Sequence, residues 1–216
     1  MKKNARFTLS CLMTCVFVLL AAGSAQQKVA TYNVGLSSVE SPADTKKQFG
    51  ETKVVEFAED GVNKYRYTDD IIDITWYVDT KQFNFELVNK SNHTIKINWD
   101  DISYVDINGR AGRVMHAGVK YDEKNNSQPG TTIPKGTRLS DLLLPTDNVS
   151  WISAGQYSRW TETTLIPSVY KNKELYDLNA YKYIGKTMMI LMPIVIENVQ
   201  NDYVFTFKIN ELNPLK

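Results

Sequence analysis

The chain of 216 residues carries 25 basic and 24 acidic side chains, which gives a formal net charge of +1 at neutral pH. This balance, with no stripe of Lys and Arg, argues against the phosphate-neutralising surface that nucleic-acid binding requires. Both cysteines fall at positions 11 and 15, so a chain that starts near residue 26 can form neither a disulfide nor a thiolate metal site.

The first 25 residues have the order of a secretory signal peptide. Three basic residues precede an apolar run over residues 7–22, and small residues follow at 23–25. Hydroxyl side chains interrupt the run, which is shorter than the ~20 apolar residues that a membrane span needs. We therefore expect residues 1–25 to be cleaved and the mature chain to be periplasmic or extracellular, with no transmembrane segment.

The segment that follows predicts an edge strand and then a series of hairpins. Residues 26–50 hold one short alternating piece at 29–34 and continue as a polar loop. Beyond them, apolar residues alternate with polar ones between Asn, Asp and Gly, which is typical of half-buried strands. On this pattern we predict strands over residues 52–57, 63–67, 71–77, 83–87 and 95–99.

Asn108-Gly109 is the strongest local signal in the chain. Two residues that tolerate positive φ predict a two-residue type I′ hairpin. That register would pair Asp101 with His116 and Tyr104 with Arg113, unless a bulge at residues 111–112 shifts it.

The second half of the chain continues the β pattern. A polar loop is expected at residues 121–130, an irregular stretch at 153–170 and one helix at 173–181. The predicted strands are 139–144, 149–152, 187–196 and 203–209. Many short strands with almost no helix predict an all-β domain over residues 51–216, an immunoglobulin-like antiparallel β-sandwich with at most one short helix.

The sequence contains no assembled catalytic set. It has no Walker loop, no dinucleotide-binding glycine pattern and no G-x-S-x-G elbow, and we expect no metal and no cofactor. Asp101 facing His116 has two interpretations, either a base or metal ligand held by a carboxylate, or a charge pair that fixes the hairpin register. The pair lacks the third group that either chemistry requires, so no catalytic residue is assigned.

Aromatic residues in the irregular region 150–165, which are Trp151, Tyr157 and Trp160, are the best candidates for binding. Loop aromatics can stack on sugars or anchor a protein partner, and they can equally plug the open end of a core. The candidate binding residues are Asp101, Arg113, His116, Tyr121, Trp151, Tyr157 and Trp160.

Several short motifs carry a family resemblance. They are Trp99-Asp100, Asp106 before a turn, the run from Arg113 to Tyr121, residues 133–136, residues 145–148 and Gly185-Lys186. Together they resemble a group of uncharacterised secreted proteins and lipoproteins of Gram-negative bacteria with a β-sandwich, over roughly residues 65–210. The resemblance implies fold and location, and it transfers no activity.

These observations predict an exported β-sandwich that binds a protein or glycan partner of the cell envelope. One alternative is a hydrolase that uses His116 with a carboxylate. A second alternative is a structural subunit of an envelope assembly, which an open strand edge at residues 29–34 would favour.

Overall fold

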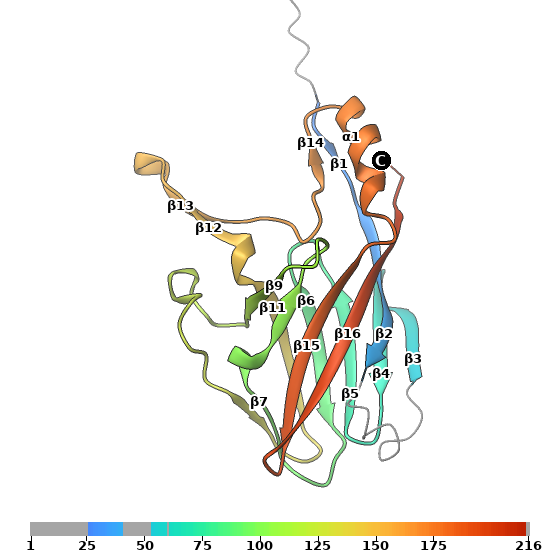
Figure 1. Ribbon diagram of the computed structural model, residues 1–216, viewed down its shortest axis with the longest axis vertical. Coiled ribbons are helices and arrows are strands. Elements are labelled where there is room, and N and C mark those ends of the chain that lie inside the picture. The colour runs from blue at the N-terminus through green and yellow to red at the C-terminus, as the bar shows by residue number, and fades with distance from the viewer. Residues whose placement is uncertain (1–25, 41–52, 60, 215–216) are drawn as a thin grey trace, which may run out of the picture.

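The computed structural model describes residues 26–40, 53–59 and 61–214. This part of the chain consists mostly of antiparallel strands and contains one α-helix (Figure 1). None of its helices is long and apolar enough to span a lipid bilayer. The predicted signal peptide at 1–25 and most of the predicted polar loop, residues 41–50, lie outside the described residues.

The elements are short and follow one another closely along the chain. They are β1 (Lys28–Val29), β2 (Tyr32–Glu40), β3 (Lys53–Glu59), β4 (Val62–Thr68), β5 (Ile72–Val78), β6 (Phe83–Asn89), β7 (Ile95–Ile97), β8 (Ser103–Val105), β9 (Ala111–Met115), β10 (Thr131–Ile133), β11 (Arg138–Pro145), β12 (Val149–Ile152), β13 (Arg159–Glu162), β14 (Val169–Tyr170), α1 (Lys173–Asn179), β15 (Thr187–Ile196) and β16 (Val199–Leu212).

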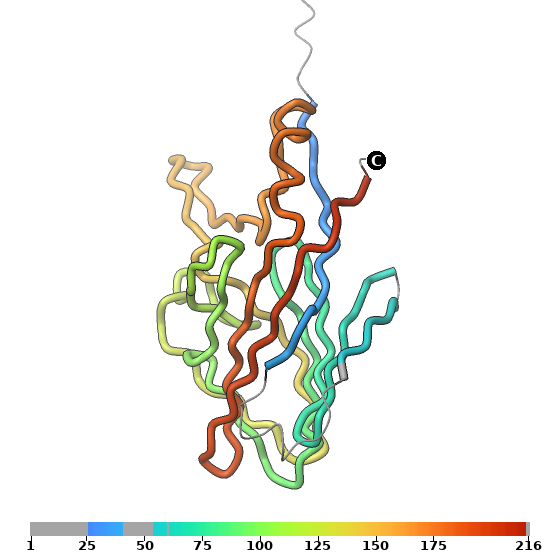
Figure 2. Tube along the Cα trace, turned by 45° about the vertical axis from the view of Figure 1, so that its right-hand side comes forward, coloured from blue at the N-terminus to red at the C-terminus, as the bar shows by residue number. Residues whose placement is uncertain are grey.

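One large sheet wraps around the core. Strands β3, β4, β5, β6 and β11 pair in that order, and β9 and β8 continue the sheet to β15, β16 and β2. Strand β2 then lies against β3, β4 and β5, so the two ends of the sheet come close together. Figure 2 shows the C-terminal hairpin crossing the body of the molecule beside β2. The result is two facing layers with the apolar side chains between them.

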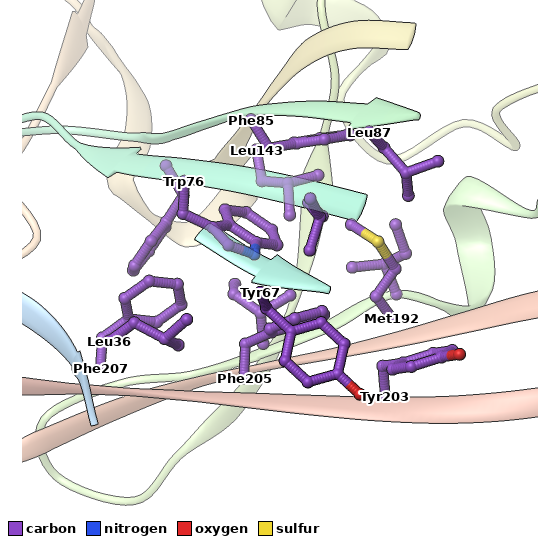
Figure 3. Packing of buried hydrophobic residues seen from close by; sticks show 14 of the residues in the cluster. Leu36, Tyr67, Trp76, Phe85, Leu87, Leu143, Met192, Tyr203, Phe205 and Phe207 are labelled. Atoms are coloured by element: carbon purple, nitrogen blue, oxygen red, sulfur yellow. The ribbon is translucent and has the colours of Figure 1, made fainter. Parts of the chain in front are cut away.

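The core is built from aromatic side chains of the two layers (Figure 3). Trp76 of β5 lies 5.0 Å from Phe205 and 5.5 Å from Phe207 of β16, measured between ring centroids. Tyr67 of β4 contacts Phe205 edge-on at 6.0 Å. Successive side chains of a strand point to opposite faces, and the predicted alternation in these segments puts their aromatic residues inside. The predicted strands at 71–77, 83–87 and 203–209 are confirmed.

Asp69 places a buried carboxylate at one end of this core. Asp69 accepts hydrogen bonds from the hydroxyls of Tyr67, at 3.1 Å, and Tyr203, at 2.9 Å. Its other oxygen accepts from the backbone N–H groups of Ile71 and Ile72, each at 2.8 Å. Four donors on one carboxylate compensate for its removal from water, because buried charges are tolerated only when they are well hydrogen-bonded.

Burial of these tyrosines makes the stability of the fold depend on pH in the alkaline range. Burial, and then the charge of Asp69, raises the pKa of Tyr67 and of Tyr203, and burial with Glu56 raises the pKa of Tyr65 to about 12. An unfolded tyrosine titrates near pH ~10. The folded state therefore holds protons that the unfolded state releases, so stability is full below about pH 10 and falls as the pH rises further.

We expect the melting temperature to decline steeply above about pH 10, where unfolded tyrosines ionise. The measurement is thermal unfolding from pH 8 to 12, together with tyrosinate absorbance. Tyr203→Phe should flatten the alkaline decline. A decline of equal steepness in that variant would contradict this account.

The turn at Asn108-Gly109 differs from the prediction. The backbone of Asp106 pairs with that of Arg110, and Gly109 alone has positive φ, at 80°. The carboxylate of Asp106 accepts from the N–H groups of Asn108 and Arg110, each within 2.9 Å. This side-chain bonding stabilises a three-residue loop in place of a type I′ turn.

The longer loop shifts the predicted register by one residue. Tyr104 pairs with Gly112, and Ser103 pairs with Arg113. The predicted partnership of Tyr104 with Arg113 is therefore wrong, and so is that of Asp101 with His116. The type I′ geometry occurs instead at Glu197-Asn198, with φ of 48° and 66°, where β15 turns into β16.

Several other elements begin or end at residues different from those predicted. The fifth predicted strand ends at Ile97, because Trp99–Asp101 form a turn of 3-10 helix. The predicted irregular stretch contains β13 and β14, and the helix ends at Asn179. The predicted strand at 29–34 is split between β1, which pairs with β14, and β2, which pairs with β16. Those pairings occupy one side of each strand.

Candidate functional site

Strands β12 and β13 form a hairpin that stands away from the body of the protein (Figures 1 and 2). Trp151 lies directly opposite Trp160, and their ring centroids are 5.6 Å apart at an interplanar angle of 62°. The tip is closed by Ser158, whose hydroxyl accepts from the N–H of Ala154 and donates to the carbonyl of Gly155. An aromatic cross-strand pair of this kind stabilises a hairpin and holds both rings on one face.

The two tryptophans differ in exposure. Trp151 is 52% exposed, and Tyr157 at the tip is 70% exposed. Trp160 is half-buried and contacts Tyr121 edge-on at 6.0 Å. It also packs against a small apolar cluster formed by Met115, Leu144 and Val149. Trp160 therefore joins the hairpin to the body, while Trp151 and Tyr157 face solvent and do not plug the core.

Polar contacts fix the base of the hairpin. The hydroxyl of Tyr121 donates to one oxygen of Glu162, and Lys81 lies 2.9 Å from the other oxygen. Tyr121 comes from the loop after β9, and Lys81 precedes β6. Three distant segments thus meet at this carboxylate. Tyr121 is among the predicted binding residues, whereas Glu162 and Lys81 are not, because contacts between distant segments leave no local pattern in the sequence.

Arg113 holds the neighbouring loop in place. Its guanidinium lies 2.7 Å from Asp100 and donates to the carbonyls of Asn125 and Asn126. Asp100 also accepts from Ser127 and from the N–H of Gln128. The hydrogen bond from Ser127, together with those from Gln128 and Arg113, lowers the pKa of Asp100. The predicted polar loop is therefore tied to β9 and to the turn at Trp99.

We expect Arg113→Ala to loosen this loop without unfolding the protein. The variant leaves the two loop carbonyls and Asp100 without their shared donor, and these groups lie at the surface where water replaces it. Limited proteolysis should cut near residues 125–127 faster, with little change in melting temperature. Arg110→Ala, which removes an exposed guanidinium that pairs with Asp106, is the matched control. Equal cutting in both variants would contradict the role of Arg113.

His116 lies beside a different carboxylate from the one predicted. Its Nδ1 is 3.2 Å from Oδ2 of Asp141, and its ring stacks on Trp99 at 4.1 Å with an interplanar angle of 6°. Asp141 also accepts from the N–H of Ala117 at 2.9 Å. Asp101 accepts from the side chain of Asn98, and among the described residues it shares no hydrogen bond or ion pair with His116. The expectation that Asp101 orients His116 is therefore wrong.

The chemistry open to this histidine is restricted. Asp141 can hold the imidazole in one tautomer, which is the second member of a nucleophile–base–carboxylate set. Within residues 26–40, 53–59 and 61–214, no hydroxyl is hydrogen-bonded to the ring, and no group of three or more His, Cys, Asp or Glu could hold a metal ion. As it stands, the pair stabilises the junction between β9 and β11.

The position of Asp141 could have been recognised from the sequence as unusual. It lies between Leu139 and Leu143, which face Leu87 and Phe83 of β6. Alternation therefore places an acidic residue on the apolar face of a strand, where a carboxylate needs a partner. That position could have been singled out, although its partner could not.

Of the seven predicted binding residues, three come together as one surface. Trp151, Trp160 and Tyr121 are in contact, and Tyr157 extends the same hairpin at its tip. The other three, Asp101, Arg113 and His116, are placed along the β8–β9 region and take separate partners.

Comparison with known proteins identifies no family for this chain. No protein-family model matches the chain, and no curated protein matches it. A solved structure described as "X-ray structure of Northeast Structural Genomics Consortium target SoR45" is similar at 15% identity and a TM-score of 0.26. The similarity covers 81% of this chain and 86% of the other.

Proposed function

We propose that this protein is an exported binding module that recognises a protein partner of the cell envelope through the hairpin β12–β13. One observation carries the proposal, namely that the hairpin exposes Trp151 and Tyr157 while Trp160 anchors it to the body. Large aromatic side chains left in solvent on a projecting element mark interaction surfaces in soluble proteins.

The composition of the hairpin favours a protein partner over a sugar. Binding hot spots are enriched in Trp, Tyr and Arg, and this hairpin presents Trp151, Tyr157 and the exposed Arg159. A projecting element is suited to enter a groove on a partner, whereas sugars are usually bound in concave sites. The fixed base at Glu162 reduces the conformational entropy lost on binding.

We further propose that the two facing layers form a sandwich of the immunoglobulin type and that the chain acts in the periplasm or outside the cell. The packing of β4 and β5 against β16 supports the first statement. The basic, apolar and small-residue order of residues 1–25 supports the second.

The test is site-specific photocrosslinking in intact cells. A photoreactive amino acid is placed at Tyr157 and, as a control, at Lys135, which is exposed on a turn remote in sequence from the hairpin. We expect one discrete crosslinked protein from position 157 and none from position 135. Crosslinks of equal yield and pattern from both positions, or none from position 157, would overturn the proposal.

A further inference from the structure

A groove of about 620 Å³ lies on the outer face of the layer formed by β3, β4, β5, β6 and β11. None of its lining residues belongs to the hairpin β12–β13. Figure 2 shows the β3–β4 hairpin leaning away from β2 at this edge of the molecule. The volume is within the ~300–1,000 Å³ range that is usual for small-ligand sites.

The strand register places a row of hydrogen-bonding side chains across this face. Arg66 pairs with Thr75, Thr75 with Glu86, and Glu86 with Ser140. The row therefore offers a guanidinium, a hydroxyl, a carboxylate and a second hydroxyl on four neighbouring strands. Such an alternation of donors and acceptors matches a ligand whose own groups both donate and accept, as sugar hydroxyls do.

The next row adds a ring and an unused donor. Tyr77 lies opposite Asn84, and Tyr77 is 37% exposed. Asn84 is only 8% exposed; its Oδ1 accepts from Gln82 at 2.8 Å, but its Nδ2 has no hydrogen-bond partner among the described residues. A buried amide without a partner is uncommon. Its nitrogen is inaccessible to solvent, so it adds polarity beneath the groove and is not a contact surface for a ligand.

The charge of the groove excludes an anionic ligand. Three carboxylates of this face line the groove, those of Glu59, Asp73 and Glu86, against two cations, because the carboxylate of Asp141 points to the opposite face and binds His116. A surplus of negative charge would repel phosphate or carboxylate groups. We propose that this groove binds a neutral oligosaccharide, which stacks on Tyr77 and exchanges hydrogen bonds with Thr75 and Glu86.

This site is independent of the hairpin, and its test separates the two. Cellotetraose, xylotetraose, maltotetraose and tetra-N-acetylchitotetraose are titrated into the protein by calorimetry and saturation-transfer NMR, with tetragalacturonate as the charged comparison. We expect at least one neutral tetrasaccharide to bind with a Kd in or below the millimolar range and tetragalacturonate to bind more weakly.

Variants locate the binding. Tyr77→Ala should weaken the tetrasaccharide about tenfold or more because it removes the stacking ring, while Tyr77→Phe should stay within about threefold. Thr75→Val keeps the side-chain shape and removes one hydroxyl, so it should also weaken the tetrasaccharide. It tests the groove if Tyr77→Ala does not fold. Trp151→Ala is the control and should bind the sugar as the native chain does.

Three results would overturn the proposal. They are no binding of any neutral tetrasaccharide at 10 mM, tighter binding of tetragalacturonate, and loss of binding in Trp151→Ala with retention in Tyr77→Ala and Thr75→Val. The last result would move the sugar site to the hairpin. None of the three depends on the crosslinking experiment, so this proposal and that of a protein partner can fail separately.

Discussion

Asp69→Ala is expected to lower the free energy of unfolding by about 4 kcal/mol, since a buried donor left without an acceptor costs roughly 1–3 kcal/mol and this carboxylate serves four. The hydroxyls of Tyr67 and Tyr203 and the N–H groups of Ile71 and Ile72 all lose their acceptor. Relaxation and entering water will recover part of the sum. Urea unfolding at pH 7, followed by tryptophan fluorescence, measures the difference.

Two comparisons isolate the cause. Asp70→Ala changes the exposed neighbour and should stay within about 0.5 kcal/mol of the native chain. Adding Tyr67→Phe and Tyr203→Phe to Asp69→Ala should restore part of the lost stability, because removing both partners of a hydrogen bond costs less than removing one. A triple variant less stable than Asp69→Ala would show that packing around Asp69, and not the unpaired donors, sets the loss.

Trp151→Ala is expected to weaken binding of the protein crosslinked from position 157 by about 30-fold, because truncation of a hot-spot residue costs about 2 kcal/mol or more. Its side chain is 52% exposed, so the substitution should leave the melting temperature nearly unchanged. The affinity is measured by calorimetry or surface plasmon resonance with the purified partner.

Trp160→Ala is the informative companion variant. Trp160 packs against Tyr121 and the small apolar cluster, so its loss should reduce stability as well as binding. Val199→Ala serves as the control, because Val199 is 63% exposed at the start of β16 and should change neither quantity. Unchanged affinity in Trp151→Ala, with the fold intact, would remove the hairpin from the binding surface.

Local patterns predicted the elements well where one face of a strand is buried. Trp76 and Phe205 lie at the buried, alternate positions of their strands, and burial of one face fixes which side chains point inward. The same reasoning failed at Asn108-Gly109, where the carboxylate of Asp106 bonds to the backbone and favours a longer loop. A single extra loop residue then changed every cross-strand partner of that hairpin.

In the candidate site, too, local patterns predicted some features and missed others. Residue type alone singled out Trp151 and Trp160, because aromatic residues in short or irregular segments at the edge of a domain are suited to contacts. Their mutual contact depends on β13, which lies in the stretch predicted to be irregular. The partners of Tyr121 and His116, which are Glu162 and Asp141, are 41 and 25 residues away and could not be read from local spacing.

Local patterns along the chain are enough to specify the β character of this protein, its inward-facing aromatic residues and its charge balance, because alternation and composition are properties of short segments. Tertiary structure alone decided which carboxylate faces His116, that Trp160 anchors the hairpin while Trp151 stays exposed, and that Arg66, Thr75, Glu86 and Ser140 form one row. These relations depend on the pairing of strands that are distant in the chain, and pairing is set by turn geometry and by packing of the whole core.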